Sequence, residues 1–209
     1  MRTRIKICGL TREEDVAAAC EAGADAVGFN CYAKSPRYVA PSRLRALARE
    51  VGPYTVPVLL FVNAEPAVVE AARDAVPHAI LQFHGDEREP DCSVYGVPYV
   101  RAIRMDLGVD LLDCERHFSS AAALLLDTPS AVYGGTGTAF DWDRIPQRRT
   151  RPVILAGGLN SDNVADAVRR VRPYAVDVSS GVEEGPGIKG AARMAAFIEA
   201  VRGADRHGQ

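Results

Sequence analysis

Arg4-Ile5-Lys6-Ile7-Cys8-Gly9 lies close to the start of the chain and predicts a short β-strand that ends at a thiol. Ile5 and Ile7 alternate with charged residues, a period of two that is typical of a strand, and Gly9 allows a turn that a Cβ atom would obstruct. Cys8 is therefore expected at the carboxyl end of the strand, which in an α/β barrel carries the active site. A cysteine in this place can also be a small buried apolar residue, and the rest of the chain has to decide between the two.

The composition indicates one globular domain, or two small ones at most. The chain has 209 residues, of which 47% are hydrophobic and 25% charged, with a formal net charge of -2. This balance, with 7% aromatic residues, gives no footprint for nucleic acid, and no apolar run approaches the roughly 18 residues of a membrane span. We therefore expect a cytoplasmic protein with neither nucleic-acid nor membrane partners.

The cysteines indicate neither a disulfide framework nor a structural zinc site. They are odd in number and widely scattered, and no two of them form a C-x-x-C pair. We expect no metal. The five positions are Cys8, Cys20, Cys31, Cys92 and Cys114.

Eight short apolar segments, at intervals of about 20–30 residues and mostly separated by amphipathic stretches, predict a single (β/α)8 TIM barrel. We expect the barrel over residues 1–202, with a last helix over 191–201 and a flexible tail over 203–209. Because such barrels typically have about 250 residues, helices must be trimmed, most of all after strands 4 and 5. A doubly wound open sheet is the alternative, but no G-x-G-x-x-G follows the first strand. The predicted strands are 4–8, 26–29, 55–61, 79–83, 98–103, 123–126, 152–156 and 175–178.

Three polar positions predict where helices begin. Thr11-Arg12-Glu13-Glu14 has the T-x-x-E form of a capping box, in which the hydroxyl and the carboxylate satisfy the first helical amides. Asn63 is placed to cap a third helix, and Asn160 or Ser161 to cap the helix that ends near Val171.

Two glycine-rich loops predict a phosphate site. They follow the seventh and eighth strands, at 155–159 and at 177–182 with 185–189 behind it. In a barrel these loops usually bind phosphate, because glycine exposes backbone amides to the ligand. The alternative is that these glycines only end their strands. The implied ligand is a phosphorylated small molecule, and its candidate contacts are Gly157, Gly158, Ser180 and Gly181.

An acidic residue ends the sixth strand on the same predicted face as the thiol. Leu124-Leu125-Leu126-Asp127 places Asp127 at the carboxyl end of an apolar strand. Such an aspartate can simply cap the segment that follows. A thiol and a carboxyl that meet at a phosphate pocket instead suggest acid and base chemistry on a sugar phosphate, with Cys8 and Asp127 as the catalytic pair.

Motifs spread along the chain resemble the phosphoribosylanthranilate isomerase family of tryptophan biosynthesis. They run in order from the first predicted strand to the eighth, and this coverage is more specific than any one motif. The matching segments are Lys6-Ile7-Cys8-Gly9-Leu10-Thr11, Lys34-Ser35-Pro36-Arg37-Tyr38, Gln82-Phe83-His84-Gly85, Leu126-Asp127, Gly134-Gly135-Thr136-Gly137 with Phe140-Asp141-Trp142, Leu155-Ala156-Gly157-Gly158-Leu159, and Asp177-Val178-Ser179-Ser180-Gly181-Val182-Glu183.

The resemblance implies a cofactor-free Amadori rearrangement that converts N-(5'-phosphoribosyl)anthranilate to 1-(2-carboxyphenylamino)-1-deoxyribulose 5-phosphate. Asp127 would be the general acid that protonates the ribose ring oxygen. Cys8 would be the general base that removes the proton from C2', so nearby positive charge should lower its pKa. Arg37 would pair with the anthranilate carboxylate through its planar fork.

Four further residues have two interpretations each. His84 could line the pocket or order a loop, and Asp177 could point to the pocket or support residues that do. Gln82 could hydrogen-bond near the reacting centre or satisfy a polar network in the core. Lys189 could steer phosphate, although a surface lysine is the expected role.

The chain departs from the family pattern at three places, and the first of them bears on the substrate. Asn30-Cys31-Tyr32-Ala33 stands where the family usually has an aliphatic residue, an aromatic residue and a proline. Phe83 replaces a leucine, and Gly190 replaces an acidic residue. The amide of the first departure would alter the wall of the aromatic-substrate pocket, so a variant substrate is possible.

Two other functions are alternatives. One is the related histidine-pathway isomerase, which performs the same rearrangement but has an aspartate at the position of Cys8. The other is a non-catalytic barrel that binds a phosphorylated ligand, and the presence of Cys8, Asp127 and Arg37 argues against it. The sequence leaves open whether the protein is a monomer or a homodimer.

Overall fold

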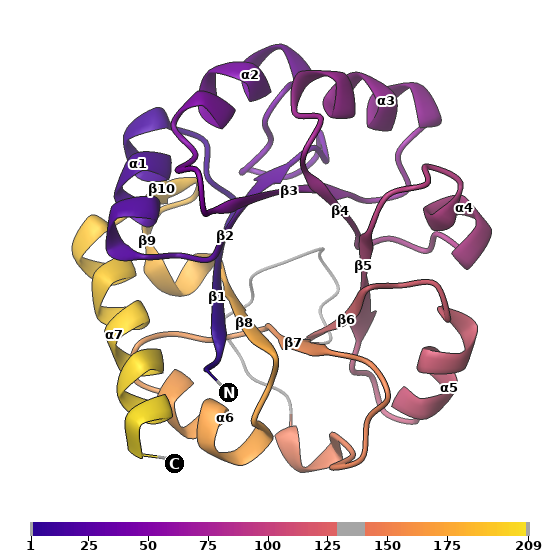
Figure 1. Ribbon diagram of the computed structural model, residues 1–209, viewed down its shortest axis with the longest axis vertical. Coiled ribbons are helices and arrows are strands. Elements are labelled where there is room, and N and C mark those ends of the chain that lie inside the picture. The colour runs from indigo at the N-terminus through magenta and orange to yellow at the C-terminus, as the bar shows by residue number, and fades with distance from the viewer. Residues whose placement is uncertain (1, 129–140, 208–209) are drawn as a thin grey trace.

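The computed structural model describes residues 2–128 and 141–207, and these form a closed barrel of eight parallel strands (Figure 1). The strands pair in chain order, and β8 (Ala175–Val178) pairs with β1 (Arg4–Cys8) to close the ring. The predicted (β/α)8 architecture is confirmed, and each barrel strand lies on the segment that the sequence predicts for it. The other six strands are β2 (Ala26–Asn30), β3 (Val56–Phe61), β4 (Ile80–Phe83), β5 (Tyr99–Arg104), β6 (Ala123–Asp127) and β7 (Val153–Leu155).

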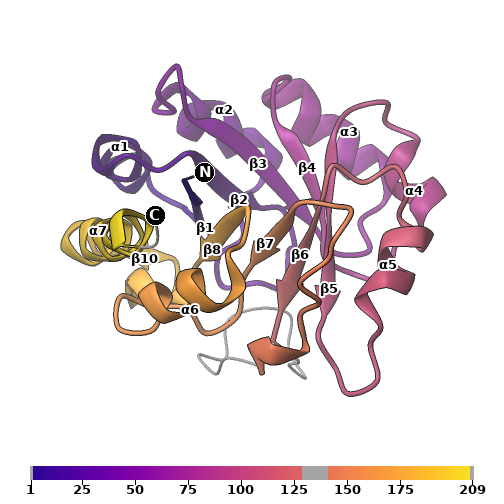
Figure 2. The ribbon, with the colours of Figure 1, turned by 60° about the horizontal axis from the view of Figure 1, so that its bottom comes forward.

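The helices lie outside the ring of strands in both views (Figures 1 and 2). Among the described residues the shortest α-helices are α4 (Glu89–Ser93) and α5 (Leu111–His117), as expected after strands 4 and 5. The connection from β6 to β7 contributes only the 3-10 turn η1 (Trp142–Arg144) within its described part. The other α-helices are α1 (Glu13–Ala22), α2 (Pro41–Arg49), α3 (Pro66–Ala75), α6 (Val164–Val171) and α7 (Ala191–His207).

A short antiparallel pair of strands follows the barrel. The chain leaves β8 through the 3-10 turn η2 (Ser180–Val182) and forms β9 (Glu183–Gly185) and β10 (Ile188–Lys189) before it enters α7. Figure 1 places this pair between α1 and α7, outside the barrel. It brings a glutamate and a lysine close to the carboxyl ends of β1 and β8.

The strand alternation divides the core into two layers. On β6, Leu124 and Leu126 pack against the surrounding helices, whereas Ala123 and Leu125 point into the barrel. The interior residues form a separate apolar group, here called the barrel-floor cluster. Its members are Ile80, Val100, Ala102, Ala123, Leu125, Ile154, Ala156 and Ala175.

Two of the predicted helix caps are wrong. Helix α1 begins after Arg12 without a side-chain cap, because the Thr11 hydroxyl donates to the carbonyl of Gly187 instead. Asn63 lies before α3 with a φ of 47°, and its carboxamide oxygen accepts from the amide of Asp86 rather than from the helix. Both side chains are used for contacts with a neighbouring loop, which the local sequence does not show.

The third predicted cap is wrong about the helix boundary, because Asn163 precedes α6 and makes no side-chain cap hydrogen bond; the last helix is longer than expected. Asn160 accepts from the amides of Asp162 and Asn163, in the turn that leads into α6. Helix α7 continues through the residues expected in a tail, because Ala204 is buried and Asp205 accepts hydrogen bonds from the amide and hydroxyl of Thr3.

Candidate active site

A pocket opens at the carboxyl ends of the barrel strands. It gathers side chains and backbone from the ends of several barrel strands and from the loops after β1, β2, β7 and β8. Of the residues predicted to be catalytic or to bind the substrate, all but Gly181 line it. The predicted residues in its wall are Cys8, Arg37, His84, Asp127, Gly157, Gly158, Asp177 and Ser180.

A larger cavity of about 680 Å³ lies at the other end of the barrel. Arg2, Arg151 and Tyr174 are among the residues that line it, and no thiol and no histidine does. The chemistry expected from the sequence therefore belongs to the smaller pocket.

Cys8 ends β1 with its thiol in the pocket wall and only 6% of the residue exposed. Two residues earlier on the same face, Lys6 lies buried in the barrel interior, and its Nζ is 2.9 and 3.0 Å from the two carboxylate oxygens of Asp177. Lys6 and Asp177 are direct neighbours in the pairing of β1 with β8. Asp177 therefore lies at the edge of the pocket, but both of its oxygens are bound to a lysine.

The charge state expected for Cys8 differs from the one that the structure favours. Burial raises the pKa of the Cys8 thiol above its ordinary value, while the ammonium groups of Lys6 and Lys189 lower it and Asp177 raises it further. The positive charge anticipated beside the thiol is present, but desolvation outweighs it.

Asp127 lies in a chain of polar side chains that crosses the pocket. Its Oδ2 is 3.0 Å from Nε2 of His84, and Nδ1 of His84 is 3.3 Å from the amide nitrogen of Gln82. Because an amide nitrogen only donates, Nδ1 accepts and Nε2–H of His84 donates to Asp127. His84 and Gln82 thus hold the carboxyl group in place, and Gln82 faces the barrel interior as the alternation allows.

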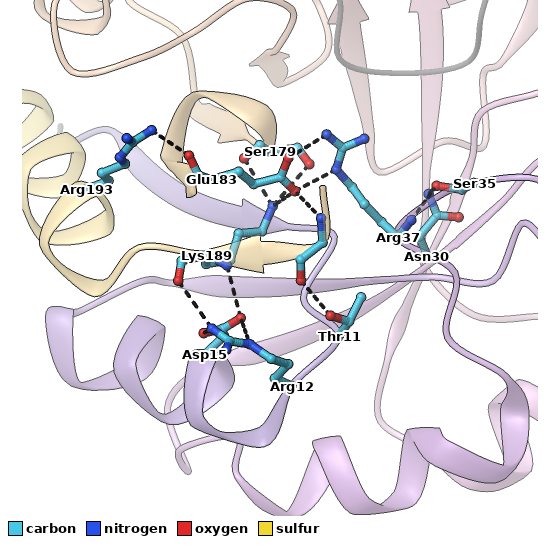
Figure 3. A network of polar contacts seen from close by, with 11 residues as sticks. Thr11, Arg12, Asp15, Asn30, Ser35, Arg37, Ser179, Glu183, Lys189 and Arg193 are labelled. Atoms are coloured by element: carbon cyan, nitrogen blue, oxygen red, sulfur yellow. Dashed lines mark hydrogen bonds and ion pairs between the residues drawn. The ribbon is translucent and has the colours of Figure 1, made fainter. Parts of the chain in front are cut away.

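Arg37 extends from the loop after β2 to a buried glutamate (Figure 3). Its Nε and Nη2 donate to the two carboxylate oxygens of Glu183 at 2.7 and 2.6 Å. Glu183 thus occupies the edge of the guanidinium that Nε and Nη2 form. The Nη1 side of the group is the one left for a ligand. The sequence did not single out Glu183 as a partner.

Lys189 is buried, and the expectation of a surface lysine is wrong. Its side chain is 0% exposed, and its Nζ donates to Glu183 at 2.8 Å and to the carbonyl of Ser179 at 3.1 Å. Burial opposes the ionised form of Glu183, but Arg37 and Lys189 outweigh it and hold the pKa of Glu183 below its ordinary value. The turn from β9 to β10 carries Lys189 under the site, which its sequence neighbours do not reveal.

The predicted glycines are positions of close approach. Gly157 and Gly158 have φ angles of 79° and 66°, and a Cβ atom on Gly157 would lie 2.8 Å from Oδ1 of Asp127. Gly181 does not line the pocket, but a Cβ atom there would lie 2.0 Å from the carbonyl oxygen of Leu159. These glycines let the loops after β7 and β8 approach each other and the acid.

Asn30 organises the loop that carries Arg37. Its amide group donates to Oγ of Ser35 at 3.0 Å and its oxygen accepts from the amide of Tyr32 at 2.9 Å, while Oγ of Ser35 also accepts from the amide of Arg37. Neighbouring Cys31 is buried, and burial raises its pKa to about 12. The departure at Asn30 thus has a structural role within this loop.

One expected motif lies mainly outside the described residues. Gly134-Gly135-Thr136-Gly137 and Phe140 are not described, whereas Asp141 caps η1 and Trp142 is buried. Within the described ranges, no cluster of three or more histidine, cysteine or acidic side chains could hold a metal ion, and no helix is long and apolar enough to cross a membrane.

Lys6 is the functional candidate that sequence reasoning passed over, although a signal was available. If Cys8 points into the barrel, the two-residue period of the strand places Lys6 on the same inward face. A charged residue at an interior strand position is uncommon enough to mark a site.

Comparison with known proteins gives one consistent family. Residues 5–200 match the model of the family "N-(5'phosphoribosyl)anthranilate (PRA) isomerase". The N-(5'-phosphoribosyl)anthranilate isomerase of Methylibium petroleiphilum is 58% identical over 205 residues, which are 98% of this chain and 96% of the relative.

Solved structures agree with the sequence relatives. A phosphoribosyl anthranilate isomerase in complex with reduced 1-(o-carboxyphenylamino)-1-deoxyribulose 5-phosphate matches with a TM-score of 0.80 and 36% identity, over 96% of this chain and 99% of that one. A structure of monomers generated from the dimeric isomerase of Thermotoga maritima matches with a TM-score of 0.79 and 36% identity, with the same coverage.

Proposed function

Because the chain belongs to the N-(5'-phosphoribosyl)anthranilate isomerase family, we propose that Cys8 and Asp127 are the base and the acid of its reaction. The protein is an aldose-ketose isomerase of tryptophan biosynthesis. It converts N-(5'-phosphoribosyl)anthranilate to 1-(2-carboxyphenylamino)-1-deoxyribulose 5-phosphate by an Amadori rearrangement. The observation that carries the residue assignment is that a thiol and a carboxyl, from opposite sides of the barrel, line one pocket at the carboxyl ends of β1 and β6.

Asp127 acts first, as a proton donor to the ribose ring oxygen. The bond between C1' and that oxygen breaks while the anilino nitrogen supplies an electron pair, which leaves an open-chain iminium. The carboxylate that remains accepts from Nε2–H of His84 at 3.0 Å, a contact that stabilises the charge formed in this step.

Cys8 acts second, as a thiolate that removes the proton from C2'. The electrons of that C–H bond form a C1'=C2' double bond and the iminium nitrogen takes back its pair, which gives an enolamine. Loss of the O2' proton and addition of a proton at C1' then give the ketone. The positive iminium favours the thiolate over the thiol, and this attraction opposes the effect of burial.

Five of the other predicted residues would bind the two ends of the substrate. We assign the phosphate to the backbone of Gly157 and Gly158 together with Ser180 and Gly181, because these two loops meet at the pocket and glycine exposes amides there. Arg37 would hold the anthranilate carboxylate with the guanidinium edge that Glu183 does not engage.

The alternatives from the sequence lose their support. The matched relatives named above are phosphoribosylanthranilate isomerases, which removes the reason to invoke the histidine-pathway reaction. A binding-only barrel would not need an acid held by histidine opposite a thiol. A cytoplasmic location and a monomeric or homodimeric state remain parts of the proposal.

The loss of anthranilate-type fluorescence tests the reaction directly. Purified protein is mixed with freshly generated N-(5'-phosphoribosyl)anthranilate, the spontaneous hydrolysis rate is subtracted, and the product is identified chemically. We expect formation of the ribulose phosphate. A folded protein that leaves only hydrolysis products would contradict the proposal, and other phosphoribosyl amines would then be tested because of Asn30.

A further inference from the structure

Lys6 is buried inside the barrel directly beside the candidate base. Its side chain is 6% exposed, and that of its partner Asp177 is 8% exposed. A buried ion pair contributes little net stability compared with apolar residues of the same volume, since both charges lose their hydration. The presence of this pair at the level just below the pocket therefore requires another explanation.

The geometry brings the Lys6 ammonium close to the sulfur. An atom added as Cβ on Gly28 would lie 2.8 Å from Sγ of Cys8 and 3.1 Å from Nζ of Lys6, so the two groups share the space that this glycine leaves open. Gly28 is paired with Cys8 across β1 and β2. The Lys6 ammonium donates to both carboxylate oxygens of Asp177, and these contacts hold it in place beside the thiol.

Other charged groups face the thiol from the neighbouring elements. Lys189 approaches from β10 and Arg37 from the loop after β2, but Glu183 binds both of them. Across the pocket, His84 and Asp127 are bound to each other. Lys6 is thus the cation that lies on the strand of the thiol itself and is held by a carboxylate of the adjacent strand.

We propose that Lys6 is a positioning residue whose ammonium, anchored by Asp177, stabilises the Cys8 thiolate that accepts the C2' proton. This inference rests on the proposed function of Cys8. It also gives Asp177 a role, which is to orient Lys6 rather than to contact the substrate.

The electrostatics of the pair are consistent with this role. Burial disfavours the ammonium of Lys6, but Asp177 and Cys8 together outweigh burial and hold the pKa of Lys6 above its ordinary value. The charged form of Lys6 is therefore favoured beside the thiol. It is also the strongest influence that opposes the effect of burial on Cys8.

The test measures the thiol itself, apart from catalysis. The rate of Cys8 alkylation by iodoacetamide is followed against pH by peptide mass spectrometry, in the wild type, Lys6→Met and Lys6→Arg. We expect Lys6→Met to lower the thiolate fraction at a given pH by about 10–10³-fold, the usual effect of an opposite charge at this range, and Lys6→Arg to restore most of it. An unchanged pH dependence in Lys6→Met would overturn the inference.

A double variant separates this role from a purely structural one. Lys6→Met alone leaves Asp177 unpaired, whereas Lys6→Met with Asp177→Asn removes both charges and keeps the shape of the pair. The inference requires the double variant to retain a reduced thiolate fraction and kcat/KM to fall at neutral pH. A return of the double variant to the wild-type titration would show that Lys6 only neutralises Asp177.

A measurement on the unsubstituted barrel applies even if these variants do not fold. The chain has three lysines, Lys6, Lys34 and Lys189, so the Cε signals of ¹³C-labelled lysine can be assigned. The Lys6 signal should shift as Cys8 ionises and should lose that shift in Cys8→Ser, and the absence of any shift in the wild type would overturn the inference. If the coupling is present but the isomerase reaction is absent, the proposed function fails, whereas an active isomerase without the coupling overturns only the role of Lys6.

Discussion

Three strands of this barrel change from apolar to polar between one inward-facing residue and the next, which is two positions further along the chain. On β4 the inward positions run from Ile80 through Gln82, and on β6 Leu125 is followed by Asp127. On β8, Ala175 is followed by Asp177. The barrel-floor cluster is therefore apolar and largely buried, whereas the level above it contains charges and hydrogen-bonding groups.

Burial has opposite effects on the free energy of the apolar floor and of the charged level above it. Burial of the apolar side chains stabilises the fold by roughly 25 cal/mol per Å² of apolar surface. The buried pair of Lys6 and Asp177 loses hydration that its own attraction only partly returns. We conclude that, of these two levels inside the barrel, the floor contributes to stability, whereas the upper level has charged groups that the proposed chemistry uses.

The largest effect is expected at the acid. Asp127→Asn keeps the shape of the side chain but removes the proton donor, so kcat should fall by about 10²–10⁴-fold, the typical loss of general acid catalysis. The free energy of unfolding should stay close to that of the wild type. Asp106→Asn, at an exposed position after β5, serves as the control in the same fluorescence assay. Near-normal turnover by Asp127→Asn would remove its assigned role.

A substitution in the barrel-floor cluster should lower stability and leave catalysis largely unchanged. Leu125 is 0% exposed, and Leu125→Ala should lower the free energy of unfolding by about 2–5 kcal/mol through lost transfer energy and a cavity. Kinetics of the folded fraction should change far less. Leu107→Ala, at a side chain that is 95% exposed, should change stability by less than about 0.5 kcal/mol in the same denaturant titration. Equal effects from the two leucines would show that the floor is not what stabilises the barrel.

Gly157→Ala tests how precisely Asp127 must be positioned. The residue has a φ of 79°, and the new methyl group would lie 2.8 Å from Oδ1 of Asp127. We expect a loss of about 10²-fold in kcat/KM, because a small displacement of a catalytic group has that effect. Gly108→Ala is the matched control, since Gly108 also has a positive φ, of 91°, and an added Cβ there meets no atom within 4 Å. Comparable activity in the two variants would mean that the acid tolerates movement.

The pH dependence reports on the base and is expected to be the smallest of these effects within one pH unit. Burial raises the pKa of Cys8, so below that pKa the thiolate is the minor form and increases by about tenfold per pH unit. The rate of Cys8 alkylation should therefore rise with pH from neutrality upward, whereas kcat/KM also requires protonated Asp127 and does not isolate the thiol. A flat alkylation profile, with the protein still folded, would show that burial does not raise this pKa.

Much of this division could be predicted from the sequence. Apolar strands of constant spacing predict the barrel, and Cys8 and Asp127 each end such a strand, so their convergence follows from parallel topology. The glycines of the loops after β7 and β8 are visible for the same reason. The two-residue period of the strand also places Lys6 inside the barrel, although the alternation of Lys6 with Ile5 and Ile7 serves in the sequence analysis only to predict the strand.

Contacts between distant segments could not be predicted. Thr11 and Asn63 have the side chains of helix caps, but each bonds to a loop far away in the sequence. Lys189 looks like a surface residue among its neighbours and is buried only because the turn from β9 to β10 carries it against Glu183. Local patterns report local geometry, and these partners are set by how the loops fold back on the barrel.

The central claim is that one thiol of this barrel, and not thiols in general, removes the C2' proton. It is tested most directly by the single-turnover rate of Cys8→Ala compared with Cys31→Ala, a second buried cysteine that does not line the pocket. We predict that Cys8→Ala loses about 10²–10⁴-fold in the chemical step while Cys31→Ala remains close to the wild type. A Cys8→Ala variant that still forms the ribulose phosphate at the wild-type rate would contradict the account.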